Sequence, residues 1–110
     1  MQNEIPVSPA TNPQLPNRDH DGPLFPLGRT VATPGALAVC EQHNISPLSL
    51  IARHHRGDFG DLCDDDLKAN ESALFEGQRL LSAYNIGQEK IYVITEWDRS
   101  LTTILKASEY

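Results

Sequence analysis

The chain has 110 residues and a formal net charge of −6, with 39% hydrophobic and 22% charged residues. That length holds one domain of ordinary size. No apolar run reaches the roughly 18 residues of a membrane span, and no basic segment precedes an apolar one at the start, so we expect a cytoplasmic protein without a secretory signal. Fifteen acids against nine bases have the wrong sign for a protein that coats nucleic acid. Two cysteines are too few for a disulfide scaffold.

The first part of the chain is rich in proline. Six of the eight prolines fall within the first 26 residues. Each proline removes a backbone donor and disfavours helix in the residue before it. We therefore interpret residues 1–23 as a disordered or extended proline-rich tail, and residues 24–110 as a single α+β domain.

Two helix starts carry the same signal. Thr33-Pro34 and Ser46-Pro47 each place a capping hydroxyl before a proline, whose missing N–H costs nothing at the first helical position. They predict helices over 34–43, with Asn44 suited to the residue beyond the helix end, and over 47–56. On the second of these helices, the spacing places Leu48, Ile51, Ala52 and His55 on one apolar face and His54 beside it.

A third helix is predicted over 64–76, where three aspartates favour the N-terminus and Gly77 suits the C-terminal cap. Leu67, Asn70 and Leu74 form one stripe, which turns the Asn70 amide toward the core. A buried amide needs hydrogen-bond partners. We interpret Asn70 as a structural residue bound to a loop such as 57–62, with a substrate contact as the alternative.

After Gly77 the apolar period changes to two. Strands are predicted over 79–84, 90–96 and 101–106, and a short edge strand within 27–32. The expected fold class is α+β: about three short helices followed by a three- to four-stranded antiparallel β-meander, with the helices packed on one sheet face.

The segment from Arg53 to Asp58 is the first candidate for chemistry. It ends a helix with His54 and His55, and a histidine titrates near neutral pH. The structural interpretation is a capping cluster with one half-buried histidine, oriented by Asp58. The functional alternative is a general base or proton shuttle.

Polar residues on the strands are the second candidate. A concave sheet face that carries arginine, serine, tyrosine and threonine is able to bind phosphate. The alternative is a solvated face on which threonine occurs because of its high β-propensity. The residues in question are Arg79, Ser82, Tyr84, Lys90, Thr95, Glu96, Arg99, Thr102 and Thr103.

The acidic charge is concentrated in residues 57–77. Seven acids stand there against Lys68 alone, so this segment carries a net −6 and the remainder of the chain sums to zero. The acids are Asp58, Asp61, Asp64, Asp65, Asp66, Glu71 and Glu76. They are either a solvated helix start or a surface for a basic partner, and with Asn70, Ser82 and Tyr84 they form the candidate binding set.

Histidines and cysteines offer only one pair at metal-ligand spacing, Cys40 and His43. Structural zinc sites usually use two such pairs, so no metal is expected. The chain has no phosphate-binding glycine loop, dinucleotide fingerprint or nucleophile elbow, and no cofactor is expected.

Three blocks of the chain resemble a family of small uncharacterised proteins encoded on plasmids and integrative conjugative elements, some of them labelled type I restriction modification subunits. The blocks are 27–37, the Arg53-His54 to Leu62 segment, and 94–103; Asp66, Asn70, Ser82 and Tyr84 also fit the pattern. The resemblance implies a mobile-element context. A methyltransferase activity is not expected, because 110 residues without a methyl-donor loop cannot form that domain.

A second resemblance concerns layout. An Arg-His pair at a helix end, a further helix and a meander that ends in threonine are similar to the barnase/colicin/RelE-like ribonucleases. This resemblance implies a metal-independent endoribonuclease with His54 as base, Arg99 or Lys90 as phosphate clamp, and Thr102 or Thr103 as positioning hydroxyl.

Two hypotheses follow from the sequence. The first is an accessory protein of a mobile element that binds another macromolecule through the acidic surface around 57–77. A protein is the expected partner. The alternative is the endoribonuclease, with RNA as its partner. The sequence leaves open the oligomeric state and whether Phe59 and Trp97 lie in the core or at an interface.

Overall fold

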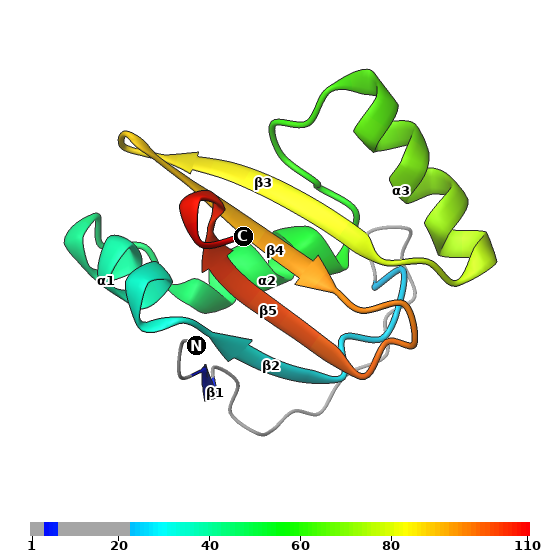
Figure 1. Cartoon of the computed structure of the whole chain (residues 1–110). Coiled ribbons are helices and arrows are strands. Elements are labelled where there is room, and N and C mark those ends of the chain that lie inside the picture. The colour runs from blue at the N-terminus through cyan, green and yellow to red at the C-terminus, as the bar shows by residue number, and fades with distance from the viewer. Residues whose placement is uncertain (1–3, 7–22) are drawn as a thin grey trace.

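The computed structural model describes residues 4–6 and 23–110, which form a five-stranded mixed sheet with three α-helices (Figure 1). Most of the predicted tail therefore lies outside the described residues. The strands are β1 (Ile5–Pro6), β2 (Arg29–Ala32), β3 (Leu80–Ile86), β4 (Glu89–Thr95) and β5 (Leu101–Lys106). The helices are α1 (Pro34–Gln42), α2 (Pro47–His55), α3 (Asp64–Glu76) and the short 3₁₀ helix η1 (Ala107–Glu109).

The predicted helix caps are confirmed. The Thr33 hydroxyl accepts a hydrogen bond from the Ala36 amide at 3.1 Å, and the Ser46 hydroxyl accepts one from the Leu48 amide at 3.2 Å. Beyond α1, Asn44 is left-handed with φ 55°, and Gly77 ends α3 with φ 74°. The bounds of all three helices therefore lie within a residue or two of the expectation, although α3 begins after Cys63 without a side-chain cap.

The predicted antiparallel meander is correct for β3, β4 and β5 but incomplete. The strand order is β1-β2-β5-β4-β3, and β2 pairs in parallel with β5. The segment within 27–32 is therefore no edge strand among the described residues, because Ile5 and Pro6 pair with its outer side. The three helices are also not all N-terminal to the sheet, since they lie between β2 and β3. Such a parallel pair requires a long crossover connection, which local patterns do not reveal.

Helices α1 and α2 cover one face of the sheet, while α3 lies beside β3 (Figure 1). The main core is formed by apolar side chains on the covered face. They are Ala32, Ala36, Val39, Cys40, Leu50, Ile51, Tyr84, Ile86, Ile91, Val93 and Ile104. A smaller cluster joins Ala73 of α3 to Leu80, Phe25 and Phe59. On the opposite face, Tyr110 packs edge-on against Tyr92 next to η1.

The predicted apolar face of α2 is wrong by one position. The buried residues of α2 are Leu50, Ile51 and His54, whereas Leu48 is 44% exposed and His55 only half-buried. The helix turns His54 inward because the ring forms hydrogen bonds with Ser82 and Thr95 on the sheet. The spacing of hydrophobic residues does not reveal these hydrogen bonds.

Candidate functional site

His54 lies at the centre of a buried polar network beneath α2. Its imidazole is completely buried; Nδ1 lies 2.6 Å from the Ser82 hydroxyl and Nε2 lies 2.8 Å from the Thr95 hydroxyl. The Thr95 hydroxyl lies 2.7 Å from that of Thr102, which donates to the Leu27 carbonyl at 2.7 Å. The network therefore joins α2 to β3, β4, β5 and the segment before β2.

The carbonyl at one end of the network determines its direction. A carbonyl oxygen can only accept, so Thr102 donates to Leu27 and must accept from Thr95. Thr95 in turn accepts from His54, which places the imidazole proton on Nε2 and leaves Nδ1 to accept from Ser82. Every member of this network has a partner, and the imidazole is neutral.

Burial explains why the imidazole stays neutral. Desolvation, with a smaller contribution from the neighbouring charge of His55, lowers the pKa of His54 to about 3. The rings of Phe25 and Phe59 contact it edge-on at centroid distances of 5.1 and 6.0 Å. A buried neutral imidazole between two hydroxyls suits a structural role.

The residues of the expected ribonuclease site do not come together. Thr102 lies in the buried His54 network, whereas Thr103 alternates with it and lies on the opposite sheet face. Lys90 is exposed on β4. Neither hydroxyl therefore faces a solvent-accessible surface that also carries His54.

Arg99 binds main-chain carbonyls. Its guanidinium donates to the carbonyls of Ala73 at 2.8 Å, Gln78 at 2.5 Å and Trp97 at 3.2 Å, and also to that of Glu96. Arg99 itself is left-handed, with φ 60°. This arginine ties the C-terminal end of α3 to the turn between β4 and β5, and it leaves few donors for a phosphate.

Asn70 is structural, but its partner is a strand rather than the 57–62 loop. The amide donates to the Leu81 carbonyl at 2.7 Å and accepts from the Leu81 N–H at 3.1 Å. The 57–62 loop binds Ala83, the next residue of β3 whose backbone groups point to the outer edge. The Ala83 N–H donates to the Phe59 carbonyl, and the Ala83 carbonyl accepts from the Asp61 N–H. Together α3 and the loop cover the outer edge of β3, which would otherwise be free to pair with another chain.

Asp58 and Tyr84 fix the loop that follows α2. The Asp58 carboxylate pairs with Arg53 at 2.7 Å, and this hydrogen bond lowers the pKa of Asp58 below its usual value. Asp58 therefore contacts Arg53 rather than a histidine. The Tyr84 hydroxyl donates to the Asp58 carbonyl at 2.6 Å, and burial raises the pKa of Tyr84 to about 12.

A polar hollow of about 390 Å³ lies between this loop and β3, lined in part by Arg53, Asp61 and Asn85. The Arg53 guanidinium stacks on the Tyr84 ring 4.3 Å from its centroid, and Asn85 donates to Asp61 at 2.7 Å. Asp58, Asp61 and Tyr84 from the candidate set therefore come together here. Their polar groups largely satisfy one another.

The remaining acids of the candidate set project into solvent. Asp64, Asp65 and Asp66 are exposed in the first turn of α3, and Glu71 and Glu76 are exposed further along it. Within the described part of the chain, the ion pair between Arg53 and Asp58 is the only one within 4 Å. The acids of α3 thus form no ion pair within that distance, and Lys68 is the one basic residue of the helix.

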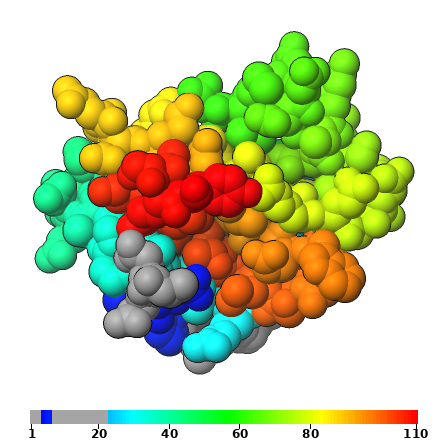
Figure 2. Space-filling model, viewed as in Figure 1, coloured from blue at the N-terminus to red at the C-terminus, as the bar shows by residue number. Residues whose placement is uncertain are grey.

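Two exposed aromatic side chains lie at the C-terminal end of α3. Phe75 is 89% exposed on the helix and Trp97 is 65% exposed in the turn between β4 and β5. Arg99 binds both segments, and Figure 2 shows the orange turn beside the yellow-green end of α3. Phe59, by contrast, belongs to the core. Phe75 was not among the residues expected from the sequence, although its spacing of four from Glu71 places it on the polar face of α3.

Comparison of the chain with family models, with characterised proteins and with solved structures finds no match. None of the helices in the described residues is long and apolar enough to cross a membrane. Over residues 4–6 and 23–110, no three His, Cys, Asp or Glu side chains are grouped so that they could hold a metal ion. Cys40 is buried, Cys63 is exposed, and both are free thiols.

Proposed function

We propose that this domain binds a basic protein partner through the exposed face of α3 and the adjoining turn between β4 and β5. The observation that carries the proposal is the coexistence of five exposed acids, none of them in an ion pair, with two exposed aromatics. The acids are Asp64, Asp65, Asp66, Glu71 and Glu76, and the aromatics are Phe75 and Trp97. We call this set the α3 surface.

The charge of the α3 surface favours a basic partner. The five acids outnumber Lys68, the one basic residue of α3, and such an excess attracts positive charge and steers its approach, so it raises the association rate at low salt. The same charge repels nucleic acid phosphate. A protein partner is therefore favoured over RNA or DNA.

The aromatic residues supply the apolar contribution that charge alone does not. Exposed apolar side chains that lie together on a surface mark interaction sites, and tyrosine, tryptophan and phenylalanine are enriched in interfaces. The four carbonyl bonds of Arg99 hold the segments that carry Phe75 and Trp97, so these side chains are presented on a firm backbone. Less ordering free energy is then needed on binding.

The resemblance to plasmid and conjugative-element proteins supports a further part of the proposal, namely that the domain acts in the cytoplasm as an accessory protein of a mobile element. The ribonuclease hypothesis has no comparable support. His54 is completely buried, Thr102 and Thr103 lie on opposite sheet faces, and Arg99 binds carbonyls.

Affinity capture with matched charge variants tests the proposal. The full chain is used as bait in lysate of a host cell, alongside Asp64→Lys/Asp65→Lys and the control Glu41→Lys/Glu89→Lys. Both pairs change the net charge equally, and the control residues lie on α1 and at the β3–β4 hairpin, away from α3 (Figure 1). We expect a basic protein bound by the wild type and the control but lost from the α3 variant.

Two outcomes would contradict the proposal. If no protein is retained by the wild type at low salt from several hosts, the binding function is wrong. If the retained protein binds the α3 variant as well as it binds the control, the surface is wrong. Cleavage of RNA by the purified chain in EDTA would favour the ribonuclease instead.

A further inference from the structure

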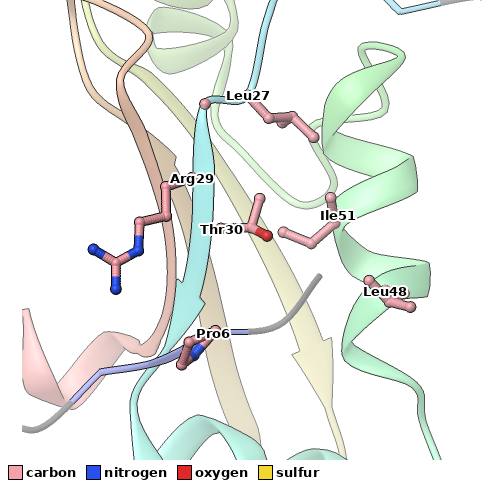
Figure 3. A pocket seen from close by; sticks show the side chains of 7 residues that line it. Pro6, Leu27, Arg29, Thr30, Leu48 and Ile51 are labelled. Carbon is pink, nitrogen blue, oxygen red and sulfur yellow. The ribbon is translucent and has the colours of Figure 1, made fainter. Parts of the chain in front are cut away.

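A second concave site lies between the outer part of the sheet and α2, away from the α3 surface. Its volume is about 350 Å³, and its walls are Leu27, Leu48, Ile51 and Pro6 with the β2 segment from Gly28 to Thr30 (Figure 3). Most of these side chains are apolar. The hollow therefore resembles small-molecule sites in size and lining, since such sites begin at roughly 300 Å³.

One polar group inside this lining has no partner. Thr30 is 7% exposed, and its hydroxyl is buried without a hydrogen-bond partner in the described structure. Figure 3 shows its oxygen on the side of β2 that faces Ile51 and α2. Valine would fill the same volume without an unpaired hydroxyl.

Other buried threonines on the same sheet face show the contrast. Thr95 and Thr102 are as deeply buried as Thr30, and each has two partners at 2.7 or 2.8 Å. The fold thus satisfies threonine hydroxyls where it uses them internally. Of these three threonines, Thr30 lacks a partner for its hydroxyl, and it is also part of the lining of the hollow.

We propose that this hollow binds a small, neutral, mostly apolar molecule that carries one hydrogen-bonding oxygen, which pairs with the Thr30 hydroxyl when a lining side chain moves to uncover it. Neutrality follows from the lining. Arg29 is the single charged residue in it, and Figure 3 shows the Arg29 guanidinium on the opposite side of β2 from Ile51 and Leu48. A charged ligand would lose its hydration there without gaining a counter-charge.

The volume sets the size of this molecule. At ~30 Å³ for each non-hydrogen atom, which is the share of one water molecule in the liquid, a hollow of about 350 Å³ holds about twelve of them. A substituted six-membered ring or a short branched chain with one hydroxyl or carbonyl group fits this description.

Phenol and toluene are the probes that test the proposal, because they differ by one hydroxyl group. Amide NMR spectra of the full ¹⁵N-labelled chain are recorded during titration with each. We expect both to shift the signals of 27–30 and 48–51, with the dissociation constant of phenol about five-fold below that of toluene. Without a hydrogen bond the order would reverse, since toluene is the more hydrophobic of the two.

Substitutions assign the preference to Thr30. Thr30→Val should abolish the advantage of phenol, whereas Thr30→Ser, which keeps a hydroxyl, and the control Thr103→Val on the other sheet face should retain it. Leu48→Trp should weaken binding of both probes by filling the hollow. The amide spectra show directly whether each variant is folded.

The proposal is overturned if neither probe shifts the 27–30 and 48–51 signals, or if toluene binds as tightly as phenol to the wild type. It is also overturned if Thr30→Val keeps the phenol preference, or if Leu48→Trp leaves both affinities unchanged. None of these outcomes depends on the α3 surface, so the two proposals succeed or fail separately.

Discussion

The end of α2 and the exposed face of α3 are neighbours in sequence and are both rich in polar residues, yet the fold uses them in opposite ways. At the end of α2, His54 binds two hydroxyls and Arg53 binds Asp58. On α3, the aspartates of the first turn have no cationic partner in the described structure. Polar residues that are satisfied internally stabilise the fold, and those left unpaired at the surface are available to a partner.

The largest expected effect is that of removing His54. His54→Ala leaves a cavity beneath α2 and takes the acceptor from the Ser82 hydroxyl. We expect the free energy of unfolding to fall by about 4 kcal/mol. Urea denaturation followed by circular dichroism measures this change. His43→Ala, at an exposed position beyond α1, is the control, and a loss below about 1 kcal/mol for His54→Ala would show that the network is not structural.

Acid should destabilise the protein for the same reason. The pKa of His54 is about 3 in the folded chain, below the ordinary value of 6.5, so the unfolded chain binds the proton first. Stability is therefore complete above pH 6.5 and falls as the pH decreases toward 3. Between pH 6.5 and pH 5 the loss should be about 2 kcal/mol.

The control for this pH effect is His54→Phe, which removes the titrating group and keeps a ring. Burial also lowers the pKa of His55, so a smaller slope should remain. Urea denaturation at several pH values gives both slopes. An equally steep pH dependence in His54→Phe would assign the effect to other groups.

Loss of the Asn70 amide should have an intermediate effect. Asn70→Leu leaves the N–H and carbonyl of Leu81 without partners at the edge of β3, which should cost about 2 kcal/mol of unfolding free energy. Hydrogen exchange at the Leu81 amide should accelerate more than at the Ala83 amide, which the loop still covers. Equal acceleration at both amides would mean that the edge opens as one unit.

Reversal of charge on α3 should have the smallest effect on stability. Asp64→Lys/Asp65→Lys removes favourable interactions with the helix N-terminus, and we expect a loss of about 1 kcal/mol or less. Urea denaturation measures it beside Glu41→Lys/Glu89→Lys. A loss comparable to that of His54→Ala would show that the acids of α3 serve the fold rather than a partner.

Local signals in the sequence predicted the elements well. Capping residues and periodicity indicated α3 over 64–76, the left-handed Asn44 and Gly77, and β5 over 101–106. These features depend on chemistry within a few residues, so a single sequence contains them. The inward stripe that carries Asn70 was predicted for the same reason.

Features that depend on distant contacts were not predicted. The parallel pairing of β2 with β5 joins segments about seventy residues apart, and no local pattern encodes it. His54 rather than His55 is buried because its ring forms hydrogen bonds with Ser82 and Thr95 on the sheet. Nothing in the sequence marks Thr30 as a binding residue, because the hollow that it lines exists only where α2 packs beside β2 in the fold.

The candidate binding set taken from the sequence includes the acids of the α3 surface but neither of its aromatic residues. The segment from Arg53 to Asp58 was predicted to be a capping cluster in which Asp58 orients a histidine. In the structure Asp58 pairs with Arg53, and His54 binds Ser82 and Thr95. Charge is visible in sequence by counting, and the spacing of Phe75 from Glu71 also indicates exposure. The exposure of Trp97 depends on how the turn between β4 and β5 packs against the rest of the fold.

Hydrogen exchange of the chain alone and with its captured basic partner tests the α3 surface most directly. We expect the bound partner to protect the amides of α3 and of the turn at 96–98, and to leave the amides of α1 and of the β3–β4 hairpin unchanged. Protection confined to α1, β2 or the hairpin, with α3 exchanging as in the free chain, would contradict it.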